Sequence, residues 1–180
     1  MDRRGNPTAW YTHSAIDFLS CKDFAGRRIL EFGAGQSTLW WARRAEFVLA
    51  LEDNKGWFQQ LKPKLSSNVK LEFVNGQMPD IEPGFDIIVV DGLHRVTCAE
   101  LSTKLMAAGG AIIVDNSDGY WGGEDSRTQP IIDMFRQNGF QRVDFYGWQP
   151  GVIVPSCTSL FFKERCFLFE GSENPAAMSV

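Results

Sequence analysis

The sequence has little of the residue types that build zinc sites or disulfide frameworks. Its 180 residues include two histidines and four cysteines, and no two cysteines form a Cys-x-x-Cys pair. The chain therefore indicates neither a zinc site nor a disulfide framework. The four are Cys21, Cys98, Cys157 and Cys166, and since Cys98 lies on a helical pattern and Cys157 near an expected strand, buried free thiols in a reducing cytoplasm are the better interpretation.

The chain also lacks an excess of basic charge and any long apolar run. Its 18 Lys and Arg are outnumbered by 22 Asp and Glu, which gives a formal net charge of -4. Proteins that bind nucleic-acid backbones usually display clustered basic surface, so nucleic acid is not expected as a partner. No run reaches the length of a membrane span, and no apolar signal-peptide core is found at the N-terminus. The expectation is a soluble, cytoplasmic protein.

Length and composition are those of an ordinary globular chain. With 180 residues, of which 44% are hydrophobic, the sequence suits one well-buried domain over residues 1–180. Short apolar runs alternate with segments of helical spacing, which predicts an α/β fold with a doubly wound sheet. The expected strands are residues 28–33, 47–52, 69–74, 85–90 and 110–115, and the expected helices between them are 37–45, 54–61 and 95–108. Gly109 and Gly110 are interpreted as the stop signal of the last of these helices.

The last third of the chain departs from this alternation. A helix is expected at residues 129–137, followed by strand-like runs at 142–146 and 158–162. The 11 residues between those runs have no helical pattern, so an antiparallel pair is expected. Residues 163–180 could extend the last strand or contact a second subunit, so a homo-oligomer stays open. The earlier connection over residues 75–84 has hardly any room for a full crossover helix.

The most informative stretch is residues 29–38, because an apolar strand runs there into a glycine turn and then a helix. Gly33 and Gly35 can adopt backbone angles closed to other residues and let a ligand approach the main chain. Glu31 lies near the end of the apolar strand, where an acid suits a positively charged ligand better than a pyrophosphate. The turn therefore has the layout of a nucleotide-binding site for a ligand with positive charge.

The next expected strand ends in Glu52 and Asp53, about 20 residues after the glycine turn, where nucleotide-binding βαβ units place a ribose-binding acid. Two carboxylates there can bind two hydroxyls. Glu52 is the preferred ribose ligand, with Asp53 as the alternative. Ser37 or Thr38 can cap the helix that follows the glycine turn.

The acid-x-Gly-x-Gly turn at residues 31–35 resembles the first motif of class I S-adenosylmethionine-dependent methyltransferases, in which the turn holds the methionine part of the cofactor. A dinucleotide-binding turn fits less well, because Thr38 occupies the position of its third glycine. The resemblance covers residues 10–162 and implies a Rossmann-like, seven-stranded, mostly parallel sheet with an antiparallel strand near the C-terminus. With the polar ends of the neighbouring strands, the predicted cofactor-binding residues are Glu31, Gly33, Ala34, Gly35, Ser37, Glu52, Asp53, Asn75, Gly76, Gln77 and Asp91.

Polar residues also follow the fourth and fifth expected strands. Asp91 ends the first of these strands and Asp115-Asn116 end the second. The two strand ends resemble those of divalent-metal-dependent O-methyltransferases of the catechol and caffeoyl-coenzyme A type, in which they coordinate magnesium. The resemblance implies Mg²⁺ as a second cofactor with Asp91, Asp115 and Asn116 as ligands, and oxygen ligands suit such a hard cation.

The metal-dependent family has a lysine base three residues after its first metal ligand, and His94 has that position here. A neutral imidazole can accept a hydroxyl proton near pH 7. The run from Asp91 to His94 also resembles bacterial sugar and macrolide O-methyltransferases, in which histidine bases are found. His94 and Asp91 are therefore the predicted catalytic residues, and a surface histidine that caps the next helix is the alternative for His94.

Two segments are candidates to cover the site. Trp10 and Tyr11 precede the first expected helix, where they could fold over the cofactor or anchor the helix in the core. The loop over residues 117–130 contains Tyr120 and Trp121, and it could be a substrate lid or a plain surface loop.

These resemblances imply an enzyme that transfers a methyl group from S-adenosylmethionine to a hydroxyl of a small molecule, such as a metabolite, a sugar or a lipid-linked head group. A chain of this length leaves no large accessory domain to recognise a macromolecule. Two alternatives stay open: a non-catalytic domain that senses S-adenosylmethionine or its demethylated product, and a metal-independent methyltransferase with His94 as base. The sequence identifies neither the acceptor nor the methylated atom, which could be oxygen or nitrogen.

Overall fold

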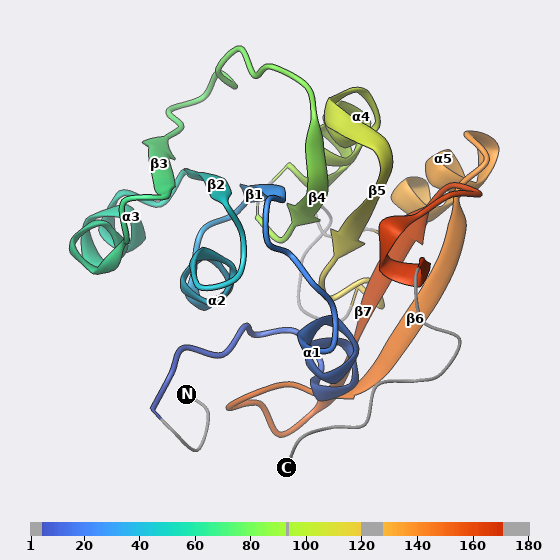
Figure 1. Cartoon of the computed structure of the whole chain (residues 1–180), viewed down its shortest axis with the longest axis horizontal. Helices are drawn as coiled ribbons and strands as arrows, with labels where there is room; N and C mark the ends of the chain where they lie inside the picture. Colours follow the sequence, from blue (N-terminus) through green and yellow to red (C-terminus); the bar gives the residue numbers. More distant parts are fainter. Residues whose placement is uncertain (1–4, 93, 120–127, 171–180) are drawn as a thin grey trace.

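The computed structural model describes residues 5–92, 94–119 and 128–170, and the structural statements below concern these residues. Seven strands form one sheet in the order β3-β2-β1-β4-β5-β7-β6 (Figure 1). The strands are β1 Arg28–Phe32, β2 Phe47–Glu52, β3 Val69–Phe73, β4 Phe85–Val90, β5 Met106–Val114, β6 Gln141–Trp148 and β7 Pro155–Phe162. The helices are α1 His13–Ser20, α2 Gln36–Ala42, α3 Lys55–Leu61, α4 Arg95–Leu105 and α5 Gln129–Gln137. None of these helices is long and apolar enough to cross a membrane.

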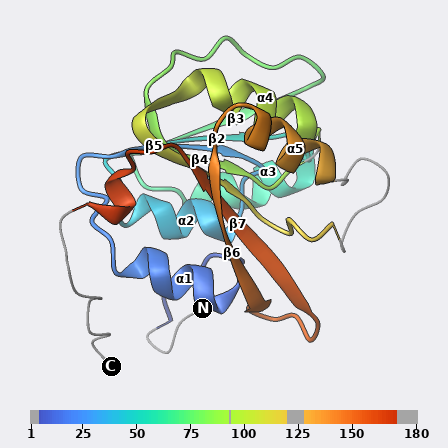
Figure 2. The same ribbon diagram turned by 90° about the vertical axis from the view of Figure 1, so that its right-hand side faces the viewer.

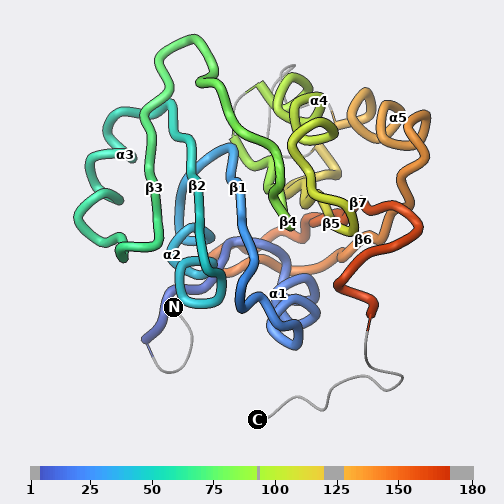
Figure 3. Tube along the Cα trace, turned by 45° about the horizontal axis from the view of Figure 1, so that its top comes forward, coloured from blue at the N-terminus to red at the C-terminus, as the bar shows by residue number. Residues whose placement is uncertain are grey.

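The strand directions confirm the predicted doubly wound sheet. The pairs β1–β2, β1–β4, β2–β3 and β4–β5 are parallel, whereas β7 runs antiparallel to both β5 and β6. The chain proceeds outward from β1 through β2 to β3 and then returns across the sheet to β4. Ligands bind at such a reversal, beyond the carboxyl ends of the two strands that flank it. The connection from β3 to β4 is an irregular loop without a helix, as its length predicts (Figure 3).

Helices cover both faces of the sheet. Figure 2 shows α1 and α2 on one side and α4 and α5 on the other. Successive side chains of the central strands enter the two cores in turn: Ile29, Val48, Ile87, Val89, Ala111 and Ile113 on the α1 and α2 side, and Leu30, Leu49, Ile88, Val90, Ile112 and Val114 on the other. Each fully buried Val, Leu or Ile side chain contributes about 1.5–3 kcal/mol. This two-sided burial explains why the strands are continuously apolar in sequence.

The boundary between α4 and β5 differs from the prediction. The helix ends at Leu105, and β5 begins at the next residue. Gly109 and Gly110 therefore do not stop the helix but lie inside β5, where Gly109 has a φ of +78° and the pairing register with β4 shifts. A Cβ on Gly110 would lie 2.7 Å from the carbonyl oxygen of Asp86, so this irregular pairing needs a residue without a side chain. Helix α2 also ends earlier than predicted, at Ala42.

The β6–β7 hairpin confirms the predicted antiparallel pair, and its tip reaches beyond the other strands (Figure 2). The segment before α1 is tied to this hairpin. Thr12 N donates to Thr158 Oγ1 at 3.0 Å, and Thr12 Oγ1 donates to the carbonyl of Phe145 at 2.9 Å. These bonds join the segment before α1, which carries Trp10 and Tyr11, to β6 and β7.

Candidate active site

The turn after β1 is held against the end of β4. Gly33 has a φ of +100°, and a Cβ added to it would lie 2.6 Å from the carbonyl oxygen of Asp91. No side chain fits there, and the positive φ independently favours glycine. Gly35 differs from the prediction, because its φ of -173° is extended and an added Cβ would make an ordinary contact of 3.7 Å with Trp57 Nε1. Of the two glycines, Gly33 is the one that the turn requires.

The side chain of Glu52, at the end of β2, holds the backbone of the same turn. The Glu52 carboxylate accepts hydrogen bonds from the N–H of Ala34 at 3.0 Å and of Asn54 at 2.7 Å. Burial raises the pKa of Glu52, and these two donors lower it in part. Thr38 Oγ1 accepts the N–H of Gly35 at 2.9 Å, which satisfies a donor at the start of α2. The acid that the sequence assigns to ribose therefore also positions the glycine turn.

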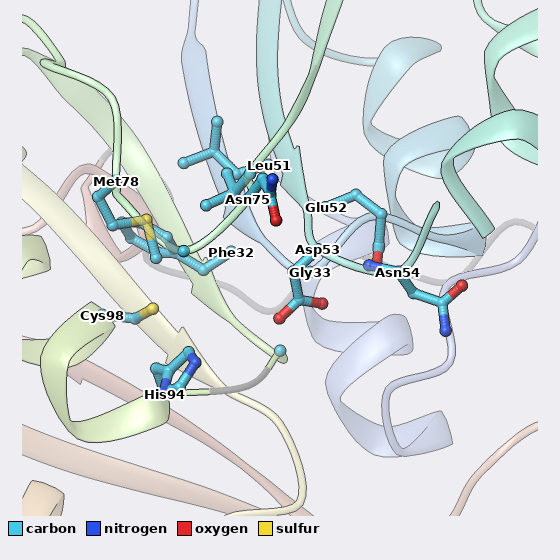
Figure 4. Close-up of a pocket in the computed structure, with 13 residues that line it drawn as sticks. Phe32, Gly33, Leu51, Glu52, Asp53, Asn54, Asn75, Met78, His94 and Cys98 are labelled. Carbon is cyan, nitrogen blue, oxygen red and sulfur yellow. The ribbon is translucent and has the colours of Figure 1, made fainter. Parts of the chain in front are cut away.

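Two adjoining cavities open at this edge of the sheet, with volumes of about 300 Å³ and 670 Å³. Gly33, Glu52, Asp53, Asn54 and Gly92 line both, so the cavities meet at the glycine turn and the end of β2. The rest of the first cavity's wall includes the apolar side chains of Phe32, Leu51, Met78 and Cys98 (Figure 4). The second is lined in addition by Trp10, Trp57, Asp91 and Arg95.

Nine of the predicted cofactor residues line one or both of these cavities. They are Asn75 and Gly76 in the first, Ala34, Gly35, Ser37 and Asp91 in the second, and Gly33, Glu52 and Asp53 in both. Glu31 and Gln77 line neither cavity. The structure therefore brings together residues that the sequence spreads over four separate strand ends.

Glu31 is fully buried on the face of the sheet that α1 and α2 cover. Burial raises the pKa of Glu31 to about 8; the hydroxyls of Thr38 and Ser37 lower it, and the charge of Asp91 raises it. Neither of those hydroxyls forms a hydrogen bond of standard geometry with the carboxyl, whose two oxygens have no hydrogen-bond partner among the described residues. A buried carboxyl without a partner is costly, so a positive charge brought to the turn would stabilise its ionised form.

Arg95, the first residue of α4, joins the ends of β4 and β5. Its Nη2 donates to Asp91 Oδ1 at 3.0 Å, and its Nη1 donates to the backbone carbonyl of Asp115. Burial raises the pKa of Asp91, and the Arg95 guanidinium offsets part of that shift. The pKa of Asp115 lies well above its usual range because of burial and the nearby charge of Asp91. The guanidinium therefore contacts the Asp91 carboxylate directly and acts on the Asp115 carboxyl through its charge alone.

The remaining partners of Asp115 come from β7 and the segment that precedes it. Thr158 Oγ1 donates to Asp115 Oδ1 at 2.5 Å, and Gln149 Nε2 donates to Oδ2 at 3.0 Å. The side-chain amide of Asn116 donates to Ser156 Oγ at 3.0 Å and to Gln149 Oε1 at 3.3 Å. Asp115 and Asn116 line neither of the two cavities.

The donors predicted to hold Mg²⁺ do not fit that ion in this arrangement. Magnesium requires near-octahedral oxygen ligands at about 2.0–2.1 Å, aimed at one point. Here the Arg95 guanidinium contacts both the Asp91 carboxylate and the Asp115 backbone, and the Asp115 carboxylate already accepts bonds from two side chains. The described residues also contain no cluster of three or more His, Cys, Asp or Glu able to hold a metal ion. The magnesium site stays a prediction, and its predicted ligands are engaged by other side chains in this structure.

The two residues predicted to be catalytic line different cavities. His94 lies in the first, at the start of α4, with an exposed side chain and a φ of +55°. Figure 4 places it next to Cys98 and across the cavity from Asn54. Asp91 lies in the second cavity together with Arg95. The role of His94 as a base therefore stays a prediction.

Sequence reasoning missed several residues of the site. Arg95 follows Asp91 by four positions, a spacing that can signal an ion pair on a helix, yet the sequence suggested only a helix start. Gln149 and Thr158 had no such signal, because they are 34 and 43 residues from Asp115. Trp57 lies in a helix as predicted, but nothing in the sequence signalled that its Nε1 donates to the carbonyl of Ala34 at 2.5 Å. The predicted lid residues 120–127 lie outside the described residues.

The sheet order and the glycine turn are those of the Rossmann-like fold of class I S-adenosylmethionine-dependent methyltransferases. No family model and no curated protein matches the chain. Solved structures do match it. One is the O-methyltransferase TomG of Streptomyces achromogenes, involved in tomaymycin synthesis and solved with S-adenosylmethionine; identity is 19%, the TM-score is 0.59, and the match covers 83% of this chain and 77% of that one.

Two further solved structures share the fold. The O-methyltransferase of Bacillus cereus, solved with S-adenosylhomocysteine, has 22% identity and a TM-score of 0.57 over 75% of this chain and 73% of that one. The precorrin-6y C5,15-methyltransferase of Geobacter metallireducens has 14% identity and a TM-score of 0.64 over 91% and 96%. At these identities the likeness establishes the fold, and it confirms the methyltransferase resemblance at that level.

Proposed function

We propose that this protein is an enzyme that transfers a methyl group from S-adenosylmethionine to a hydroxyl of a small molecule. The observation that carries the proposal is the second cavity, where the glycine turn, the acidic end of β2 and the Asp91–Arg95 pair line one space. The same fold occurs in O-methyltransferases solved with S-adenosylmethionine and with S-adenosylhomocysteine, which supports the choice of cofactor.

The residues around the two cavities suit the parts of S-adenosylmethionine. Glu31 lines neither cavity, but it lies in β1 two residues before the first glycine of the turn, and a positive charge of the methionine part at that turn would favour ionisation of its buried carboxyl. Glu52 and Asp53 offer carboxylate oxygens to ribose hydroxyls. The apolar wall of the first cavity, with Phe32 and Met78, suits a flat base. We assign the adenosine part to the first cavity and the methionine part to the second.

The chemistry left to the chain is alignment, exclusion of water and removal of a proton. S-adenosylmethionine supplies an electrophilic methyl group on a positively charged sulfur, so positioning accounts for much of the rate. Asp91 is the proposed base because it lines the second cavity and because burial raises its pKa, which makes it a better proton acceptor than an exposed aspartate. The acceptor oxygen takes the methyl group from the sulfonium, which leaves as the neutral thioether S-adenosylhomocysteine, and the hydroxyl proton passes to an Asp91 carboxylate oxygen.

The second cavity indicates a small acceptor with a ring. Its volume of about 670 Å³ has to hold the methionine part as well as the acceptor. The rings of Trp10 and Trp57 lie 6.3 Å apart on its wall, and Trp10 is 53% exposed. Exposed indole faces stack on aromatic or sugar rings. An aromatic or sugar hydroxyl is therefore the proposed acceptor group.

The first test is a calorimetric titration with S-adenosylmethionine and S-adenosylhomocysteine. Wild type is expected to bind both with dissociation constants of roughly 1–100 µM. Glu52→Gln is expected to weaken binding about 10-fold or more, since a neutral amide both loses charge and disturbs the turn. Glu100→Gln is the matched control, because Glu100 is exposed on α4. No binding of either molecule by wild type would refute the proposal.

A second measurement separates the enzyme from the sensor. Purified protein is incubated with labelled S-adenosylmethionine and a panel of phenols and sugars, and methylated products are detected by mass spectrometry. If Asp91→Asn lowers turnover and His94→Gln leaves it unchanged, the result would support Asp91 as base. The opposite pattern would support the predicted His94 base, and tight binding without turnover on any hydroxyl would favour the sensor.

A further inference from the structure

Arg95 lies at the point where the ends of β4 and β5 approach each other. Its guanidinium contacts a carboxylate oxygen of Asp91 and the main-chain carbonyl of Asp115, and only 11% of its side chain is exposed. The same guanidinium lowers the pKa of both Asp91 and Asp115. The charge that balances the two acids is therefore supplied by the chain.

We infer that Arg95 is the built-in cation of the acceptor site, standing between Asp91 and Asp115 in place of a divalent metal and facing the acceptor oxygen. The first part of this inference follows from the contacts of Arg95. The second part, its role toward the acceptor, rests on the proposed function.

A guanidinium suits this position for three physical reasons. It stays charged at any pH at which the protein is folded, so its presence depends on no ion concentration. Its planar fork donates in two directions at once, as it does here to Asp91 and to the Asp115 carbonyl. The four-residue step from Asp91 into the first turn of α4 sets its place through the backbone. A metal ion placed there would be repelled by the guanidinium.

Arg95 also lines the second cavity, as Asp91 does. When an acceptor hydroxyl transfers its proton to Asp91, negative charge develops on the acceptor oxygen. A fixed positive charge at that place stabilises the developing charge, and no reorganisation is needed at the moment of reaction. A bound metal ion would have the same effect on the hydroxyl. The proposed base Asp91 and the cation Arg95 thus form one ion pair in the wall of the second cavity.

The test of the first part uses Mn²⁺ as the probe and electron paramagnetic resonance as the readout. Wild type and Arg95→Lys, which keeps the positive charge, are expected to leave Mn²⁺ free. Arg95→Ala removes the cation from between two acids, and it is expected to bind Mn²⁺ with a dissociation constant on the order of 0.1–1 mM. The double variant Arg95→Ala with Asp115→Asn is expected to lose that binding.

Two results would overturn this part. One is Mn²⁺ bound by wild type and released by Asp115→Asn. The other is an Arg95→Ala protein that unfolds cooperatively and still binds S-adenosylhomocysteine, yet takes up no Mn²⁺. If Arg95→Ala does not fold, the wild-type and Arg95→Lys measurements decide. Absence of cofactor binding by wild type would refute the proposed function, and the Mn²⁺ result would still judge whether Arg95 replaces a metal.

The test of the second part uses whichever acceptor the panel identifies. Wild-type turnover is expected to be the same with Mg²⁺ and with a chelator. Arg95→Gln is expected to lower kcat by about 10²–10³, as does loss of a donor to a developing oxyanion, and to leave the KM for S-adenosylmethionine within about threefold. Turnover abolished by the chelator, or an Arg95→Gln enzyme with unchanged kcat, would contradict the role of Arg95.

Discussion

The two halves of the site are built in different ways. In the half assigned to the cofactor, the hydrogen bonds that hold the glycine turn lie within residues 31–57, from Ala34 and Asn54 to Glu52 and from Trp57 to Ala34. The half assigned to the acceptor joins Asp115 to partners 34 and 43 residues away. A local site survives changes elsewhere in the sheet, whereas a site assembled from distant segments depends on the whole sheet being in register.

The largest effect is expected from a substitution at Gly33, where the glycine turn of the cofactor half contacts the Asp91 backbone of the acceptor half. Gly33→Ala places a Cβ 2.6 Å from the Asp91 carbonyl and forces an L side chain to a φ of +100°. We expect a loss of stability on the order of 4 kcal/mol or more, together with loss of S-adenosylhomocysteine binding. Urea unfolding and calorimetry measure the two effects.

Gly35→Ala is the matched control in the same turn. Its extended φ of -173° and the 3.7 Å contact of an added Cβ permit an alanine. A stability change within about 1 kcal/mol is expected. Equal losses from the two substitutions would show that the turn is not packed against β4 as described.

Glu31 distinguishes the cofactor half from the acceptor half, because its buried carboxyl has no hydrogen-bond partner among the described residues. Its pKa is raised from 4.5 to about 8, so the folded protein holds a proton that the unfolded chain releases. The protonated Glu31 carboxyl therefore favours the folded state fully below about pH 4.5, and this contribution to the free energy of unfolding is lost as the pH rises to about 8. Each unit of pKa shift corresponds to roughly 1.4 kcal/mol.

Glu31→Gln is therefore expected to be as stable as wild type at low pH and more stable by a few kcal/mol above the raised pKa. Thermal unfolding over that pH range measures the difference. Parallel curves for the two proteins would contradict the raised pKa. In wild type, S-adenosylmethionine binding is expected to tighten with rising pH below about pH 8, because a cation favours the ionised carboxyl.

A substitution of Thr158, which donates a hydrogen bond to Asp115, tests the acceptor half. Thr158→Val removes the donor to Asp115 Oδ1 and the acceptor for the N–H of Thr12, both buried. A loss of about 1–3 kcal/mol is expected, since buried polar groups are left without partners. Cofactor affinity should stay within about threefold, because the cofactor half does not use this side chain. Thr103→Val, at a half-buried position of α4, is the control and should change stability by less than about 0.5 kcal/mol.

The same division explains what the sequence predicted. Gly33, Glu52 and the strand order follow from local spacing and apolar runs, and the structure places them as expected. The α4–β5 boundary was wrong because Met106 to Ala108 have ordinary helical propensity, and pairing with β4 extends the strand instead. The contacts of Arg95, Gln149 and Thr158 depend on tertiary packing, for which a single sequence carries no periodic signal. The glycine turn and the strand ends around it could therefore be predicted from the sequence, whereas the long-range contacts of Asp115 could not.

The smallest expected effect concerns Trp57, which links α3 to the glycine turn. Trp57→Phe removes the indole N–H that donates to the Ala34 carbonyl and keeps an aromatic ring next to Trp10. S-adenosylhomocysteine affinity is expected to fall about 3- to 10-fold, with stability changed by less than about 1 kcal/mol, because one partly buried hydrogen bond is lost. Trp148→Phe, on the exposed hairpin strand, is the matched control and should change neither. If Trp57→Phe binds the product as wild type does, the turn is positioned by Glu52 and Gly33 without help from α3, and the cofactor half is even more local than the hydrogen bonds indicate.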